Sequence, residues 1–150
     1  MRDWGEVDAE AVSALYRTKA GTQTLRPIQA AALSEAPICG GLFLYGRVGC
    51  GKTLISALLA VAMGAKRALI VVPGKGKLVD KTIREFKELR LHWNIPRNIR
   101  IVSYEFLGRA TNDGWLERNP CDVMICDEGH KLRDLDNCAA ARKVQRYLLA

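Results

Sequence analysis

The sequence predicts an α/β protein built around a parallel β-sheet. Short apolar runs alternate with longer segments of helical periodicity along the 150 residues. The short runs are continuously apolar rather than alternating, as expected for strands buried on both faces of a parallel sheet. A glycine-rich loop between the first apolar run and a helical segment gives the strand–loop–helix order of such sheets.

The elements follow in order along the chain. Strands are expected at residues 41–45, 68–72, 99–104 and 122–127. Helices are expected at residues 9–19, 27–35 and 52–63 and in a run from Asn137 as cap through Leu149, with one turn at 115–118. Asp8 and Asn137 are the predicted N-caps, and Pro27 suits a first helical turn. After Pro73, apolar residues recur at helical spacing with basic residues on other faces, which predicts an amphipathic helix with one basic side.

Composition narrows the function classes. The chain has 23 Lys and Arg against 16 Asp and Glu, and this excess points to an anionic ligand or a polyanionic partner. It has neither an apolar run of membrane-spanning length nor a signal-peptide pattern at its start, so we expect a cytoplasmic protein without membrane contact. Five cysteines without a CxxC pair argue against a disulfide framework and a zinc knuckle.

Residues 46–53 read GRVGCGKT and match the G-x-x-x-x-G-K-[ST] pattern of a phosphate-binding loop. Glycines let successive backbone N–H groups converge on phosphate oxygens at the start of a helix. Lys52 would then neutralise the β and γ phosphates, and the Thr53 hydroxyl would face magnesium. The alternative is a glycine-rich turn with a chance Lys-Thr pair. The predicted ATP-binding residues of this loop are Gly46, Arg47, Val48, Gly49, Cys50, Gly51, Lys52 and Thr53.

An acidic pair follows the last predicted strand, where the sequence reads Asp127-Glu128-Gly129-His130. Ligands of parallel sheets bind at the carboxyl ends of the strands. A phosphate-loop enzyme needs one carboxylate for hydrated magnesium and another for the attacking water, and this pair supplies both. The alternative is an ordinary acidic turn at the end of a strand.

Five segments in order resemble a known family: LRPIQ, GRVGCGKT, ALIVVP, IVSYEFL and CDVMICDEGHKLRD. This order is similar to the first RecA-like lobe of superfamily-two helicases and translocases, most of all the Swi/Snf-type DNA translocases and compact helicases of bacteriophages. The resemblance covers residues 25–150 and leaves 1–24 as an N-terminal helical segment. It implies a RecA-like parallel sheet sandwiched by helices, ATP and Mg²⁺ as cofactors, and nucleic acid as partner, DNA rather than RNA.

The resemblance also implies residue roles. Gln29 would read the adenine edge, and its amide can both donate and accept there. Asp127 would hold magnesium through water, Glu128 would be the catalytic base, and His130 would couple nucleotide state to the nucleic-acid track. The positions matching the nucleic-acid-contacting motifs are Pro73, Lys75, Lys77, Ser103 and Tyr104.

Charge supports a nucleic-acid track in the middle of the chain. Residues 75–109 hold nine Lys or Arg and four Asp or Glu. Phosphate contacts by such residues are independent of sequence. An ordinary solvated helix face is an equal alternative for the helical basic residues. Trp93 and Tyr104 are suited to stacking on bases, although core packing is the commoner role of aromatic residues beside strands.

Family members carry a second RecA-like lobe with an arginine finger, and a further strand between the first and last strands predicted here. We therefore expect a fragment or a half lobe that a partner in cis or in trans completes. Residues 41–45 would pair directly with 122–127 or with a strand from another chain, since unpaired buried backbone groups are costly. Two other functions remain open: a P-loop ATPase acting on proteins or small molecules, and a nucleotide-gated binding module without turnover.

Overall fold

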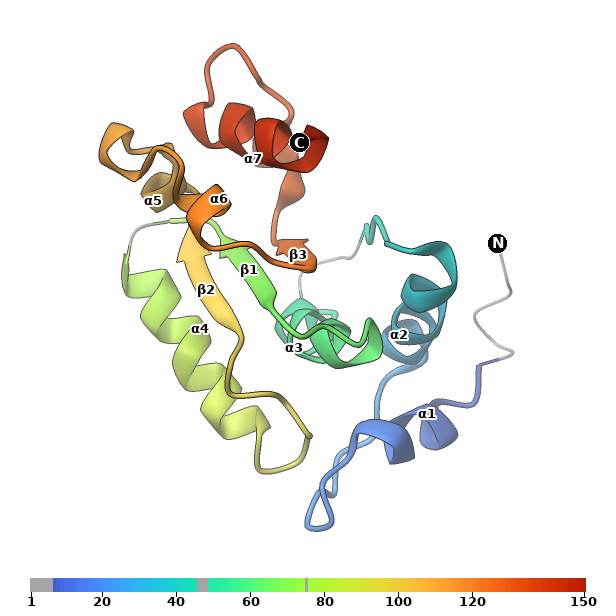
Figure 1. Ribbon diagram of the computed structural model, residues 1–150. Coiled ribbons are helices and arrows are strands. Elements are labelled where there is room, and N and C mark those ends of the chain that lie inside the picture. The colour runs from blue at the N-terminus through green and yellow to red at the C-terminus, as the bar shows by residue number, and fades with distance from the viewer. Residues whose placement is uncertain (1–6, 46–48, 75) are drawn as a thin grey trace. The chain divides into compact units, whose positions relative to one another are not determined.

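The computed structural model describes residues 7–45, 49–74 and 76–150, and it is a mixed α/β structure with a parallel sheet flanked by helices (Figure 1). The helices and strands are α1 Ala9–Tyr16, α2 Pro27–Cys39, α3 Lys52–Ala62, β1 Ala68–Val72, α4 Gly76–Leu89, β2 Arg100–Ser103, α5 Tyr104–Gly108, α6 Trp115–Arg118, β3 Val123–Cys126 and α7 Ala139–Leu149. Two short 3₁₀ helices, η2 Ala110–Asn112 and η3 Gly129–Leu132, lie in the connections. The predicted α/β class is confirmed.

The sheet has three strands in the order β2-β1-β3, and both pairings are parallel. In the register, Val71 of β1 lies opposite Val102 of β2 and Cys126 of β3. All five residues of β1 are buried, which explains why this segment reads as a continuous apolar run. Because the strands are parallel, the residues that follow β2 and β3 meet at one edge of the sheet.

The predicted strand at residues 41–45 does not form. Residues 42–45 belong to no strand, and the exposed fractions of Phe43 and Tyr45 are 84% and 92%. The direct pairing with residues 122–127 is therefore also absent, and β3 is an edge strand of the described sheet. An apolar run indicates a capacity for burial, but a strand exists only where a neighbour supplies its hydrogen bonds.

Several helix boundaries differ from the predicted ones. α2 runs past Pro37 to Cys39, and Gly40 ends the helix at φ 70°. Tyr104, predicted to end a strand, begins α5 because the Ser103 hydroxyl accepts the Phe106 N–H.

The predicted caps had opposite outcomes. The Asp8 carboxylate accepts the N–H groups of Glu10 and Ala11, as a capping residue should, so this prediction is confirmed. The prediction for α7 is wrong, because Asn137 donates to the Asp134 carboxylate in the preceding turn and the helix begins at Ala139. A turn closed by its own aspartate competes with a cap three residues later.

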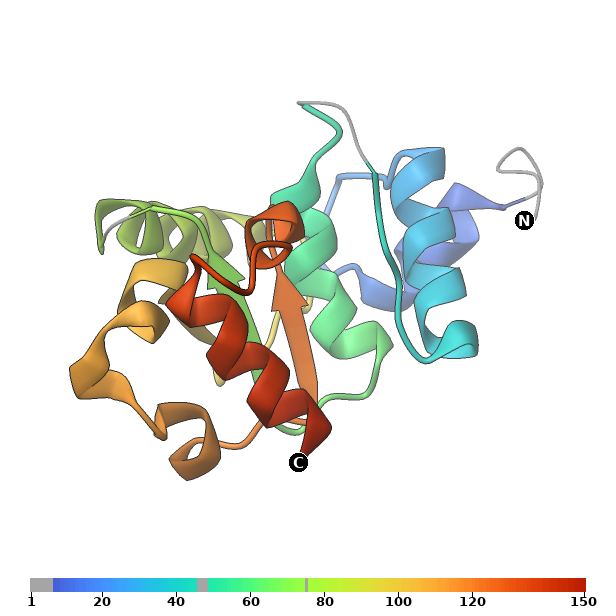
Figure 2. The same cartoon turned by 90° about the horizontal axis from the view of Figure 1, so that it is seen from above.

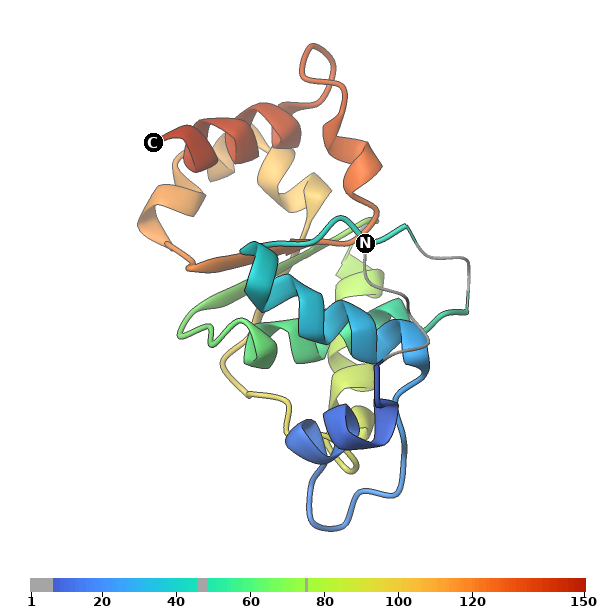
Figure 3. The same ribbon diagram turned by 90° about the vertical axis from the view of Figure 1, so that its right-hand side faces the viewer.

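The chain divides into two compact units, Met1–Ala65 with Arg84–Arg97, and Lys66–Ile83 with Asn98–Ala150. In the first unit, α2 packs on both α1 and α3 (Figure 3). Trp93, with an exposed fraction of 1%, donates its indole N–H to Gln23. Trp93 is therefore a core residue of this unit, in agreement with the commoner role weighed from the sequence.

In the second unit, α7 packs beside α5 and α6 (Figure 2). The side chains from β1 and these three helices form one buried cluster. Its members are Leu69, Val71, Tyr104, Leu107, Leu116, Ala140 and Val144. This cluster fixes the end of β2 against the helices that follow it.

One carboxylate holds the amino ends of β1 and β3 together. The oxygens of Asp122 accept the backbone N–H groups of Lys66 and Arg67, each at 2.9 Å. The Asp122 N–H in turn donates to the Arg67 carbonyl at 3.1 Å. The hydrogen bonds from Arg67 and Lys66 lower the pKa of Asp122, because they favour its charged form.

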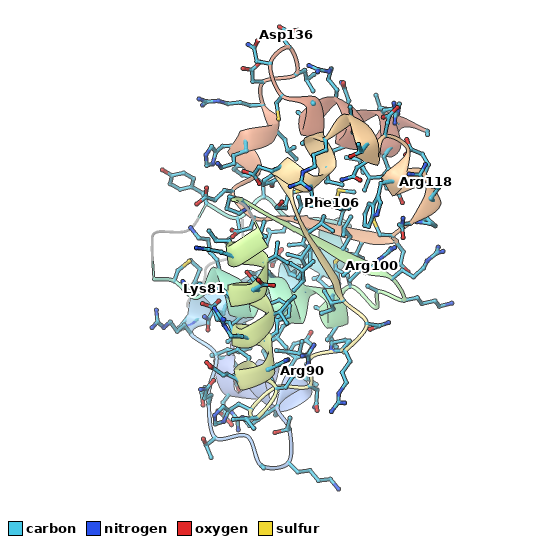
Figure 4. All side chains as sticks on the ribbon, turned by 90° about the vertical axis from the view of Figure 1, so that its left-hand side faces the viewer. Lys81, Arg90, Arg100, Phe106, Arg118 and Asp136 are labelled. Carbon is cyan, nitrogen blue, oxygen red and sulfur yellow. The ribbon has the colours of Figure 1, made fainter. Side chains whose placement is uncertain are left out.

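The lowered pKa gives a test by pH. An Asp has a pKa of about 3.9 in an unfolded chain. Asp122 should therefore stabilise the fold above about pH 4, and this contribution should disappear as the pH falls through the lower folded-state pKa. Asp122→Asn should lower the urea midpoint at pH 7 and should weaken its decline in acid. Asp136→Asn, in the exposed loop before α7 (Figure 4), is the control and should change neither. Parallel pH profiles for Asp122→Asn and the unmodified protein would contradict this role.

Candidate functional site

The phosphate-loop segment enters a helix as predicted. Residues Gly46, Arg47 and Val48 lie outside the described residues. Gly49 and Gly51 have φ values of 84° and 80°, in the left-handed region where glycine alone carries no steric penalty. α3 begins at Lys52 directly afterwards. The first N–H groups of an 11-residue helix therefore lie at the end of this loop.

Two side chains from the start of α2 hold this loop. The guanidinium of Arg26 donates through Nη1 to the Gly49 carbonyl at 2.7 Å, and Nε2 of Gln29 donates to the Cys50 carbonyl at 3.0 Å. Oε1 of Gln29 accepts the Arg26 backbone N–H at 2.8 Å, so both ends of the amide are engaged. Gln29 has an exposed fraction of 5%. In this structure it supports the loop, where the resemblance implied adenine recognition.

The hydrogen bond from Gln29 to the Cys50 carbonyl also favours glycine at position 51. A Cβ atom there would overlap Nε2 of Gln29. With any residue other than glycine at position 51, the loop backbone or the Gln29 amide would have to move. Lys52 and Thr53, the first two residues of α3, are half-buried. The local backbone therefore places the two predicted residues at the amino end of the helix.

The acidic pair forms a tight turn directly after β3. The Asp127 N–H donates to the Val71 carbonyl at 2.9 Å and extends the β1–β3 ladder by one residue. The Tyr104 hydroxyl donates to the Asp127 carbonyl at 2.7 Å. Glu128 then adopts φ 52° and ψ 49°, and it has the only positive φ among the described residues other than glycine. This conformation is strained for a residue with a Cβ atom.

Asp127 is half-buried, whereas Glu128 is exposed. Burial is the main cause that raises the pKa of Tyr104, so its hydroxyl stays protonated and donates. His130 lies in η3 and is exposed. The predicted coupling residue therefore follows the acidic turn within one short helix.

The residues predicted to contact nucleic acid differ in their exposure to solvent. Lys75 lies outside the described residues, Pro73 is half-buried, and Lys77 is exposed near the start of α4. Ser103 and Tyr104 are both 5% exposed and hydrogen-bonded within the protein. Their side chains therefore stabilise the fold. For Tyr104, the structure agrees with core packing, the commoner role of an aromatic residue beside a strand.

Sequence reasoning missed the roles of Arg26 and Tyr104. Gln29 lies three residues after Arg26, a spacing that signals the cap contact with the Arg26 backbone N–H. The guanidinium contact to Gly49, 23 residues away, has no such local signal. Tyr104 gave no such signal, because its partner Asp127 lies 23 residues away and the pairing depends on strand order.

Thr53 and Asp127 each carry an oxygen atom of a type that suits the implied magnesium ion. The Thr53 hydroxyl and the Asp127 carboxylate are hard donors of the type that Mg²⁺ takes, and Mg²⁺ binds through few protein ligands together with waters and phosphates. No cluster of three potential metal ligands of the His, Cys, Asp and Glu types occurs within the described ranges. Thr53 belongs to the first compact unit and Asp127 to the second.

Comparisons of the chain with family models, with curated proteins and with solved structures give no match. Within the part of the chain that the structure describes, every helix is too short or too polar to span a lipid bilayer.

The conformation of Glu128 predicts an unusual gain of stability. Glu128→Gly should raise the free energy of unfolding by about 1 kcal/mol, because glycine adopts a positive φ without the Cβ clash. Urea unfolding measures this change. Glu88→Gly, the same substitution at an exposed position of α4, should instead cost about 1 kcal/mol. A loss of stability in both variants would show that Glu128 is not strained.

Proposed function

We propose that this chain is the ATP-binding lobe of an ATP-dependent DNA helicase or translocase of superfamily two. The observation that carries the proposal is the start of α3 at Lys52, directly after two glycines of positive φ within a G-x-x-x-x-G-K-T segment. The parallel sheet and the acidic turn at the carboxyl end of β3 add support. A second RecA-like lobe, in cis or in trans, would complete the enzyme.

The chemistry follows from the residue types. The loop N–H groups and the Lys52 ammonium would bind the β and γ phosphates and offset their charge. Thr53, and Asp127 through water, would hold magnesium, which supplies charge neutralisation at the transferring phosphoryl group. Glu128 would accept the proton of the attacking water. Arg26 and Gln29 would keep the loop open for phosphate by holding its carbonyl groups away from the anion.

The exposed face of α4 supports an anionic partner. Lys77, Lys81 and Arg84 are exposed and are spaced four and three residues apart, so they share one face of the helix. Figure 4 shows Lys81 on α4. Such a row of cations fits the phosphates of a nucleic acid and carries no base specificity. This face replaces Ser103 and Tyr104 as the proposed contact surface.

Nucleotide binding tests the central proposal. Lys52→Ala should weaken binding of a fluorescent ATP analogue with Mg²⁺ about tenfold or more, because the phosphate charge loses its cation. Lys87→Ala, which removes an exposed lysine from α4, should bind as the unmodified protein does. Equal affinities for the unmodified chain and Lys52→Ala would refute the phosphate-loop assignment. Binding without any turnover after a second lobe is supplied would favour the gated binding module.

Salt dependence tests the nucleic-acid face. The variant with Lys77→Gln and Lys81→Gln should bind duplex DNA more weakly, and its plot of log affinity against log salt should flatten by about 1.8 units for two lost phosphate contacts. The control with Lys66→Gln and Arg67→Gln removes the same charge before the amino end of β1 and keeps the backbone bonds to Asp122. A salt-independent interaction, or equal slopes for both variants, would contradict the proposed face.

A further inference from the structure

Tyr104 joins the ends of two strands that are not neighbours. It follows β2, whereas its hydrogen-bond partner Asp127 follows β3, and β1 lies between these strands. The side chain therefore reaches across the carboxyl end of β1. A tyrosine suits this position because it combines a ring that packs in the apolar cluster with a polar tip that reaches a distant carbonyl.

Both backbone polar groups of Asp127 are hydrogen-bonded. Its N–H donates to the Val71 carbonyl, and its C=O accepts from the Tyr104 hydroxyl. The base of the tyrosine is itself fixed, because Ser103 pairs with Val72 in the sheet and caps α5. These contacts determine the direction in which the chain leaves β3.

The next residue adopts a conformation that local preferences oppose. Glu128 has a φ of 52°, and a non-glycine residue keeps such a backbone only where its surroundings impose it. The carbonyl of Glu128 itself accepts the Lys131 N–H at 3.0 Å, and the Asp127 carbonyl directly before it accepts the Tyr104 hydroxyl at 2.7 Å. Of these two bonds, only the Tyr104 bond comes from outside the turn and η3. Strain of this kind is concentrated at functional sites.

We propose that Tyr104 is a positioning residue that holds the Asp127–Glu128 turn in its strained conformation and thereby orients the acidic pair toward magnesium and the attacking water. The orientation toward magnesium and the attacking water rests on the proposed function. The holding of the turn itself can be measured without nucleotide. In this role Tyr104 contacts neither the magnesium ion nor the attacking water, and it acts only through the backbone of Asp127.

The first test is a double-mutant cycle on the 150-residue chain. Glu128→Gly should raise the folding equilibrium constant about fivefold in the unmodified protein. It should raise this constant much less beside Tyr104→Phe, because the released turn no longer forces Glu128 into a positive φ.

Tyr147→Phe is the matched control. The Tyr147 hydroxyl bonds the backbone of Cys121, accepting its N–H at 2.8 Å and donating to its C=O at 3.0 Å, before the amino end of β3. Its loss removes hydroxyl–backbone bonds of the same kind far from the acidic turn. The effects of Tyr147→Phe and Glu128→Gly should therefore add.

The second test measures the Mg²⁺ concentration that gives half-maximal binding of a fluorescent ATP analogue. Tyr104→Phe should raise it about tenfold, as expected when a residue that supports a metal ligand is removed, and Tyr147→Phe should leave it unchanged. Additive effects in the Tyr104 cycle, or equal Mg²⁺ requirements for the two phenylalanine variants, would overturn the role of Tyr104 alone. If the unmodified chain bound no nucleotide in a Lys52-dependent manner, the proposed function would fail, and with it the orientation of the acidic pair toward magnesium, whereas the double-mutant cycle would still report whether Tyr104 holds the turn.

Discussion

The hydrogen bonding of β1 on both of its edges is the constraint on which the second unit depends. Its five buried residues have no solvent to satisfy their backbone groups, so each edge needs a neighbouring strand, and here both neighbours are parallel. β2 and β3 provide these partners, and the register places Ser103 beside Val72 and Cys126 beside Val71. As a result, segments that are far apart in the sequence emerge together at the carboxyl edge.

Backbone carbonyl groups near the proposed chemistry are held by side chains. Gln29 and Arg26 hold the carbonyls of the phosphate-loop segment, and Tyr104 holds that of Asp127. In each case the donor comes from a helix start that is fixed by its own capping bond. Such bonds are satisfied before any ligand arrives, and a site arranged in this way pays less of the ordering cost when it binds.

The sequence predicted local features well where one stretch of chain contains the whole cause. The segment 68–72 forms β1 as predicted, α3 begins at Lys52, and Asp8 caps α1. The prediction failed at residues 41–45, because their apolar pattern could not show whether a neighbouring strand exists. It also missed the bond between Tyr104 and Asp127, since no periodicity connects positions that only the strand order brings together.

The sequence by itself determined the α/β class, the position of β1 and of the start of α3, and the residue types at each candidate position, because propensity, periodicity and capping act over a few neighbouring residues. Only the tertiary structure decided which polar groups are used within the protein. Gln29 and Tyr104 carry groups that can bind a ligand, yet both are buried with their hydrogen bonds directed to the backbone. A buried polar group must take whichever partner the packing brings within reach, and packing is a property of the whole fold.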